Sequence, residues 1–355
     1  MQLWTLTIAS PRGSADYAAR AEAAGWHGMM VVDSQNLSGD SYVALAMAST
    51  TTSQLGLGTG VTNTVTRHPA VTAGAIASIQ KLSGGRAVLG ISRGDSALAH
   101  LGHAPAKLHG FETYLSKLQR YLRGESVPFS ESDIDTDIAP LVADLDLADT
   151  PESSKIEWLR SDEPKVPVEV AATGPKVIAI SARHADCIMF TLGADETRLK
   201  WGIETARGAA VAAGRDPDTL KFGAYINMAC HNNIETARKL VRGGLTTFAR
   251  FSVMHGDISG PVDAGQTAVL EQLHDSYNMK QHTRNDSQQA ETLTPEFIDR
   301  FGIVGDPAAC INRLEQLRDL GMERLAISGP TMTARSAVAN EAATLLTEKV
   351  LPHFH

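Results

Sequence analysis

The chain has 355 residues, of which 43% are hydrophobic and 20% are charged, a balance typical of a globular protein with a sizeable core. Its net charge of −8 argues against a nucleic-acid-binding protein, because neutralising backbone phosphates requires a basic surface. No basic stretch precedes the strand-like residues 3–8, and no apolar run approaches the ~20 residues of a membrane-spanning helix, so we expect a cytoplasmic protein without membrane contact.

One pattern recurs along the chain: a helical segment, a short turn, and then a short apolar run that ends in a polar residue. It occurs at residues 18–33, 179–192 and 311–328. The apolar runs of about five residues are typical of parallel strands that are covered on both faces. Each occurrence therefore predicts a helix, a turn and a buried strand.

Eight strands are predicted, at residues 3–8, 28–33, 55–60, 87–92, 168–172, 187–191, 221–228 and 324–327. Helices are predicted at residues 14–24, 41–49, 69–82, 175–183, 196–213, 234–242 and 307–320. Sustained alternation predicts a parallel sheet with right-handed crossovers, and eight repeats favour closure into a (β/α)₈ TIM barrel. An open doubly wound sheet is the alternative.

Two segments interrupt this alternation within what we expect to be one domain spanning residues 1–355. Residues 124–165 contain an acidic stretch and four prolines, and residues 256–295 are rich in Gly, Gln, His and Asp. Both are too long for simple connections, so we predict insertions on the βα side of the barrel, where loops build active sites. A solvated acidic excursion without a chemical role is the alternative for residues 124–165.

Polar residues follow the second and third predicted strands. Asp33 ends the second strand, where it could cap the next helix or bind the polar edge of a cofactor. The stretch 56–69, GLGTGVTNTVTRHP, has three glycines on a buried strand, which indicates that a planar ring approaches the backbone closely. The alternative is that these glycines only fit the curvature of the barrel.

The fourth and fifth strands also end in candidate site residues. Arg93 and Asp95 follow the fourth strand, where binding groups concentrate in barrels, although a purely structural salt bridge between them is the alternative. After the fifth strand, Thr173, Gly174, Pro175 and Lys176 begin a helix whose free N–H groups and lysine would suit a phosphate. Ordinary helix initiation would also produce this motif.

The sequence indicates no metal site. Cys187, Cys230 and Cys310 are widely spaced and form no C-x-x-C, so we expect buried cysteines in a reducing compartment. No metal-ligand spacing, G-x-S-x-G or Walker motif is present.

Three stretches resemble the bacterial luciferase-like flavin and deazaflavin oxidoreductases, especially the coenzyme F420-dependent branch typified by methylenetetrahydromethanopterin reductase. They are GTGVTNTVTRHPAVTA (58–73), LSGGRAVLGISRGDSALAHLG (82–102) and AATGPKVIAISARHADC (171–187). The resemblance covers most of residues 1–230, and the order and spacing of the three stretches make it more specific than any one of them.

The resemblance implies a (β/α)₈ barrel with a cofactor ring across the strand ends and a non-prolyl cis peptide at Gly60–Val61. It places the following residues around the cofactor: Asp33, Thr59, Gly60, Val61, Thr62 and Asn63 at the ring, and Thr173, Gly174, Pro175 and Lys176 at the phosphate. Arg93 and Asp95 join the cofactor site, and Asp33, Asn63 and the neighbouring His68 are the catalytic candidates.

Two residues depart from the family pattern. Thr64 follows Asn63 where relatives often have Pro, and Ser34 follows Asp33 where the sugar-phosphate dehydrogenases have His. The second departure argues against alcohol oxidation by the machinery of those dehydrogenases.

Three hypotheses for function remain open. The first is hydride transfer between F420 and a small organic substrate, and the second is an FMN-dependent monooxygenase that uses oxygen. The third is a barrel that binds a cofactor without catalysis. The family also implies a homodimer that pairs through barrel helices.

Overall fold

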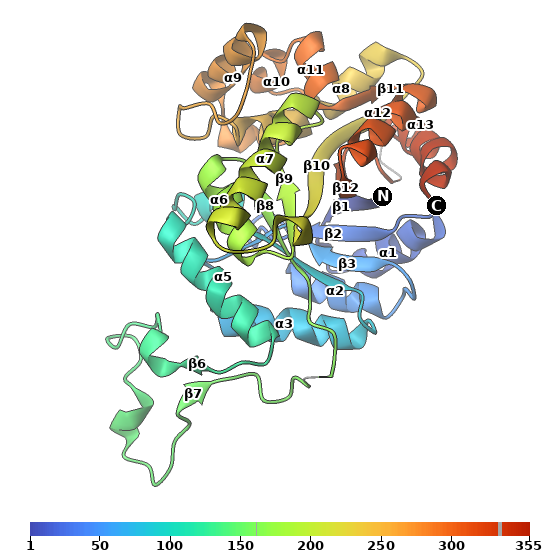
Figure 1. Ribbon diagram of the computed structural model, residues 1–355. Coiled ribbons are helices and arrows are strands. Elements are labelled where there is room, and N and C mark those ends of the chain that lie inside the picture. Colours follow the sequence, from blue (N-terminus) through green and yellow to red (C-terminus); the bar gives the residue numbers. More distant parts are fainter. Residues whose placement is uncertain (161, 333–335) are drawn as a thin grey trace.

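Eight parallel strands close into a barrel in the computed structural model, which describes residues 1–160, 162–332 and 336–355 (Figure 1). These strands are β1 (Gln2–Ile8), β2 (Gly28–Val32), β3 (Gly56–Thr59), β5 (Ala87–Ser92), β8 (Val168–Ala172), β9 (Cys187–Phe190), β10 (Lys221–Cys230) and β12 (Met322–Ser328). Each strand pairs in parallel with the next, and β12 closes the barrel by pairing with both β10 and β1. The predicted (β/α)₈ barrel is confirmed, and the open-sheet alternative is wrong.

Four short strands in the described part of the chain lie outside the eight-strand barrel. β4 (Thr62–Asn63) pairs with β5, and β11 (Ile303–Gly305) pairs with β10. β6 (Val127–Pro128) and β7 (Ser153–Ser154) form a separate antiparallel pair.

Helices surround the barrel and cover its carboxyl end. The α-helices are α1 (Ser14–Ala23), α2 (Ser41–Ser49), α3 (Pro69–Leu82), α4 (Ser96–Ala99), α5 (Leu108–Leu122), α6 (Pro175–His184), α7 (Glu196–Ala212), α8 (Ile234–Arg250), α9 (Ala264–Ser276), α10 (Gln288–Glu291), α11 (Pro295–Phe301), α12 (Pro307–Asp319) and α13 (Ala337–Leu345). Shorter helical turns are η1 (Phe129–Glu131), η2 (Val142–Leu145), η3 (Pro217–Thr219), η4 (Met279–Gln281), η5 (Leu346–Val350) and η6 (Leu351–Phe354). Within the described ranges, no helix is long and apolar enough to cross a membrane.

Helix α8 continues eight residues beyond its predicted end at residue 242, because two glycines there serve close packing and do not end the helix. A Cβ on Gly243 would lie 2.2 Å from the carbonyl oxygen of Thr283, and one on Gly244 would lie 2.7 Å from Nδ2 of Asn227. The extra turns of α8 therefore extend over the barrel mouth.

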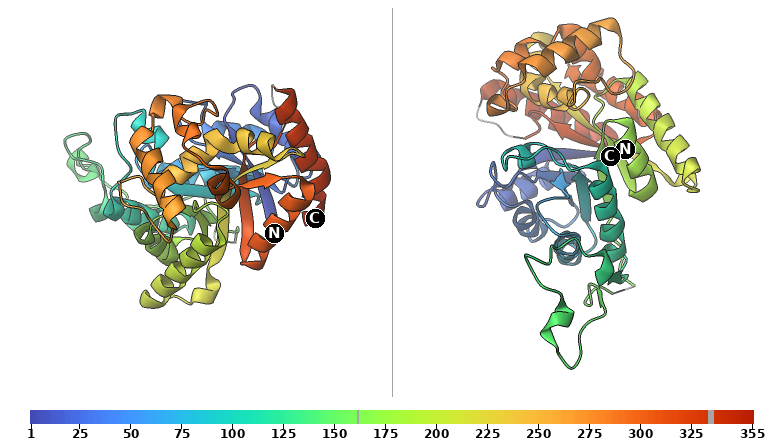
Figure 2. Two further views of the ribbon diagram at one scale, coloured as in Figure 1. Left: turned by 90° about the horizontal axis from the view of Figure 1, so that it is seen from above. Right: turned by 90° about the vertical axis from the view of Figure 1, so that its left-hand side faces the viewer.

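The two interrupting segments lie at opposite ends of the barrel (Figure 2). Residues 124–165 follow α5 and lead into β8, so they form an αβ connection, and the prediction that they lie on the βα side is wrong. One residue of this segment, 161, lies outside the described residues. Residues 256–295 lie between β10 and α12, in the βα connection that also carries α8. Only this second segment is on the rim where barrel active sites form.

Glycines on β2 and β3 make room for a tryptophan inside the barrel. Trp4 pairs with Gly28, and Gly28 pairs with Gly56, so the three residues lie in one row. A Cβ on Gly28 would lie 2.3 Å from the Trp4 ring, and one on Gly56 would lie 2.4 Å from it. The interpretation that Gly56 admits a cofactor ring is therefore wrong, because a core side chain fills that space.

Candidate active site

A cavity of about 1220 Å³ opens at the carboxyl ends of the barrel strands, beneath α8 and the segment that follows it. Ten of the thirteen predicted site residues line it: Asp33, Gly60, Val61, Asn63, Arg93, Asp95, Thr173, Gly174, Pro175 and Lys176. Thr59, Thr62 and His68 are not among its lining residues. The strand ends thus bring together residues that are up to 143 positions apart in the sequence.

The amino end of α6 forms one wall of the cavity. Gly174 is the N-cap and makes no side-chain cap hydrogen bond, and Pro175 occupies the first turn. The first N–H groups of the helix therefore have no intrahelical partner, and the helix dipole adds positive potential there. Lys176 is exposed at this helix end, and Ser259 Oγ lies 3.5 Å from where a Gly174 Cβ would be. This wall can hold a phosphate group.

The end of β3 forms another wall. The peptide bond between Gly60 and Val61 is cis, as the resemblance implied. Asn63 Oδ1 accepts hydrogen bonds from the N–H groups of Val65 at 2.9 Å and Thr66 at 3.0 Å, which fixes the amide. Its buried Nδ2 has no hydrogen-bond partner among the described residues. A donor is therefore left for a group bound in the cavity.

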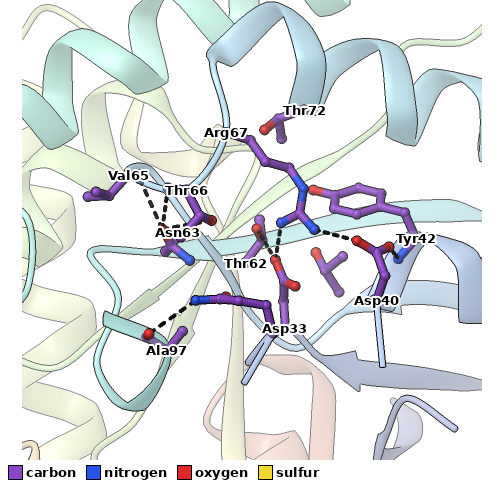
Figure 3. A network of polar contacts seen from close by, with 12 residues as sticks. Asp33, Asp40, Tyr42, Thr62, Asn63, Val65, Thr66, Arg67, Thr72 and Ala97 are labelled. Atoms are coloured by element: carbon purple, nitrogen blue, oxygen red, sulfur yellow. Dashed lines mark hydrogen bonds and ion pairs between the residues drawn. The ribbon is translucent and has the colours of Figure 1, made fainter. Parts of the chain in front are cut away.

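Asp33 belongs to a partly buried hydrogen-bond network behind this wall (Figure 3). The network includes Arg67, which was not among the predicted site residues. Asp33 Oδ2 accepts from Thr62 Oγ1 at 2.6 Å and from Arg67 Nη1 at 2.6 Å. Arg67 Nη2 donates to Asp40 Oδ2 at 2.7 Å, and its guanidinium stacks on the ring of Tyr42 at 4.7 Å. Asp33 Oδ1 is buried without a partner among the described residues. Among the described residues, only one of the two Asp33 carboxylate oxygens therefore has a hydrogen-bond donor.

Thr59 and His68 have structural contacts away from the cavity. Thr59 Oγ1 donates to the carbonyl oxygen of Gly90 at 2.7 Å, which joins β3 to β5. His68 is the N-cap of α3, and its Nδ1 accepts from the N–H of Ala70 at 3.2 Å. Burial lowers the pKa of His68, whose ring packs edge-on against Tyr121. This placement gives His68 a helix-capping role.

Arg93 and Asp95 both line the cavity but do not pair with each other. Arg93 Nε donates to the carbonyl oxygen of Ala106 at 2.6 Å, which holds the loop between α4 and α5. Asp95 forms an ion pair with Arg250 at the end of α8. The alternative of a structural Arg93–Asp95 salt bridge is wrong, because the partner of Asp95 comes from the distant helix that covers the barrel mouth.

Several site residues were missed from the sequence. Arg250 stacks on Tyr277 at 4.5 Å, and Tyr277 Oη lies 2.8 Å from Nδ1 of His282, which lines the cavity. Burial lowers the pKa of His282. These residues follow β10, where no motif marked them. Arg67, in contrast, lies inside the quoted stretch 58–73, and a charged residue so close to Asn63 was a usable signal.

The residues present fit a ring-shaped cofactor that carries a phosphate. The orphaned Asp33 Oδ1 and Asn63 Nδ2 offer one acceptor and one donor on one side of the cavity. The amino end of α6 offers the phosphate seat on another wall. The described residues contain no group of three or more His, Cys, Asp or Glu side chains that could hold a metal ion.

A family model described as luciferase-like monooxygenase matches residues 2–324. The chain is 25% identical over 330 residues to 5,10-methylenetetrahydromethanopterin reductase of Methanolobus tindarius, with 89% of this chain and 90% of the relative covered. It is 29% identical over 186 residues to an F420-dependent hydroxymycolic acid dehydrogenase of Mycobacterium tuberculosis, with 50% of this chain and 46% of the relative covered.

The fold is also similar to that of solved structures. The coenzyme F420-dependent tetrahydromethanopterin reductase of Methanopyrus kandleri superimposes with a TM-score of 0.72 at 21% identity, covering 100% of this chain and 99% of that one. At this identity the likeness concerns the fold.

Proposed function

The chain belongs to the luciferase-like monooxygenase family, and from this premise we propose that it is an oxidoreductase that transfers a hydride between coenzyme F420 and a small organic substrate. The relatives support the cofactor, because two of those described above carry F420 in their names. The observation that carries the proposal is the cavity at the strand ends, which has a phosphate seat on one wall and orphaned polar atoms on the other.

Each wall has a separate task in this proposal. Residues 173–176 bind the cofactor phosphate through the N–H groups of α6 and the charge of Lys176. The backbone of residues 60–63 supports the ring, and Asp33 and Asn63 bond to its polar edge. The deazaflavin supplies the hydride chemistry. The chain contributes orientation and the exclusion of water.

The covering helix indicates what kind of substrate fits. Where α8 and its continuation face the cavity, the lining includes the apolar side chains Leu240, Val241, Phe248, Phe251 and Met254. A small organic molecule with apolar surface would bury that surface between the ring and this helix. The polar contacts between Asp95 and Arg250 hold the end of α8 over the site.

A second candidate is an FMN-dependent monooxygenase, because the family description names a monooxygenase. FMN also combines a planar ring with one phosphate, so the two walls suit it as well. The cofactor therefore decides between the two functions.

Titration of the purified protein with F420 and with FMN, followed by cofactor fluorescence, tests the proposal. We expect saturable binding of F420 and weaker or no binding of FMN. Tight FMN binding without a response to F420 would overturn the first candidate in favour of the second. Binding of F420 with no turnover of reduced F420 across a panel of ketones, imines and enones would instead indicate a binding protein.

A further inference from the structure

Arg67 joins three separate elements behind the cavity wall (Figure 3). It comes from the turn between β4 and α3 and reaches Asp33 at the end of β2. Its second Nη atom reaches Asp40, whose Oδ1 also caps α2 by accepting from the N–H groups of Tyr42 and Val43. The guanidinium lies over the ring of Tyr42, 4.7 Å from its centroid. With two carboxylates and one aromatic ring around it, the guanidinium has a single fixed position.

The two carboxylate oxygens of Asp33 differ in their hydrogen bonding. Oδ2 accepts from both Arg67 and Thr62, whereas Oδ1 has no partner among the described residues although Asp33 lines the cavity. The Asp33 side chain is 0% exposed, so water does not satisfy Oδ1 from bulk solvent. A buried acceptor without a partner is costly in a native protein. A hydrogen-bond donor on a ligand in the cavity would satisfy it.

The electrostatics agree with a charged pair. Burial works to lower the pKa of Arg67, but the Asp33 carboxylate outweighs burial, so the pKa of Arg67 is raised. An ionised carboxylate has only acceptor atoms. The group that meets Oδ1 must therefore carry an N–H or O–H.

We propose that Arg67 is a positioning residue that fixes the Asp33 carboxylate, so that Oδ1 accepts a hydrogen bond from an N–H or O–H of the ring bound in the cavity. The part that concerns the ring rests on the proposed function, whereas the pairing itself does not. Lysine could not replace Arg67 fully, because an ammonium lacks the planar fork that directs separate Nη atoms to Asp33 and Asp40.

The pairing is tested first without any ligand. In Arg67→Met the buried Asp33 carboxylate has no cation, and burial then disfavours its charge, so the variant should lose more thermal stability at pH 8 than at pH 5. Replacing Asp33→Asn in the same variant removes the uncompensated charge and should restore part of the melting temperature at pH 8. An equal loss at both pH values, or no recovery in the double variant, would overturn the pairing.

The positioning role is tested by F420 titration. We expect Arg67→Met to raise the dissociation constant by about tenfold or more, as the loss of one fixed polar contact predicts, and Arg67→Lys to give a smaller rise. Arg120→Met is the matched control, because Arg120 also bonds to a carboxylate, that of Glu131, at 2.8 and 2.9 Å, but faces the segment 124–165, none of whose described residues lines the cavity. Unchanged F420 affinity in Arg67→Met would overturn the role.

The two proposals fail in different ways. If Arg67→Met does not fold, the F420 titration of Arg67→Lys tests the positioning role instead. If the wild-type protein binds no F420 while the stability cycle behaves as expected, the proposed function and the ring contact fail but the Arg67–Asp33 pairing stands. If the wild-type protein binds F420 and the variant binds it equally well, only the positioning role fails.

Discussion

Removing the charge of Lys176 is the most direct test of the phosphate seat at α6. Lys176 is exposed, so water screens its attraction to a bound phosphate. Two unit charges about 4 Å apart attract by ~1 kcal/mol in water and by ~4 kcal/mol at an effective dielectric constant near 20. Side-chain ordering offsets part of this, and we expect Lys176→Ala to cost about 1.4 kcal/mol, a tenfold weaker F420 affinity. Binding should persist, because the N–H groups of α6 remain.

Fluorescence titration at low and high salt measures this change. The wild-type affinity should fall more steeply with salt than that of Lys176→Ala, since the variant has lost a screened charge. Lys200→Ala is the matched control, because Lys200 is an exposed lysine near the start of another helix, α7, and does not line the cavity. An affinity for F420 that is unchanged in Lys176→Ala, or reduced equally in Lys200→Ala, would refute a phosphate seat that involves this lysine.

Three further predictions concern the surroundings of the site. Arg198 is 1% exposed and donates to Ser252 Oγ at 2.8 Å and to the Ser259 carbonyl oxygen at 2.9 Å. Because Arg198→Met would leave these buried acceptors without their donor, it should lower the free energy of unfolding by about 3 kcal/mol in urea titrations. Unaltered urea midpoints would contradict this. Replacing residues 132–150 by a Gly-Ser linker should leave the F420 dissociation constant unchanged, because none of those residues lines the cavity, and a weaker affinity would show that the segment reaches the site. The pKa of the Glu22 carboxyl is lowered from its ordinary value. Burial acts to raise this pKa, but hydrogen bonds from the backbone N–H groups of residues 53 and 54 outweigh burial. The ionised Glu22 carboxylate therefore stabilises the fold fully above its ordinary pKa of 4.5, and this stabilisation is lost as the pH falls through the pKa of the folded state. The difference in urea midpoint between wild type and Glu22→Gln should accordingly shrink from pH 7 to pH 3. A constant difference would count against the hydrogen-bonded carboxylate.

The barrel was predictable because its pattern is local. Each of the eight predicted strands overlaps a barrel strand, and helix bounds such as those of α2 and α3 agree with the prediction to the residue. Apolar runs, helical periodicity and prolines at helix starts all act over a few residues, so the sequence displays them directly. The strand ends were predictable for the same reason, since parallel strands place their carboxyl ends on one rim.

At two glycines the local sequence pattern was ambiguous, and contacts with residues elsewhere in the chain determined the local structure. The predicted helix ended at residue 242, just before Gly243, but the backbone of Thr283 packs against this glycine and α8 continues. Gly56 suggested room for a cofactor, but Trp4 fills that space. In both cases a glycine marks a close approach, and the sequence does not say which group approaches.

The sequence by itself determined the alternation of strands and helices and the candidate residues at the strand ends. The tertiary structure alone decided which charges meet: Asp33 pairs with Arg67, and Asp95 pairs with Arg250 and not with Arg93. It also turned His68 into a helix cap and placed residues 124–165 on the rim away from the site. Hydrophobic periodicity repeats over a few residues and can be read directly from the sequence. An ion pair instead depends on the directions of two side chains, and these are set by how distant elements pack together.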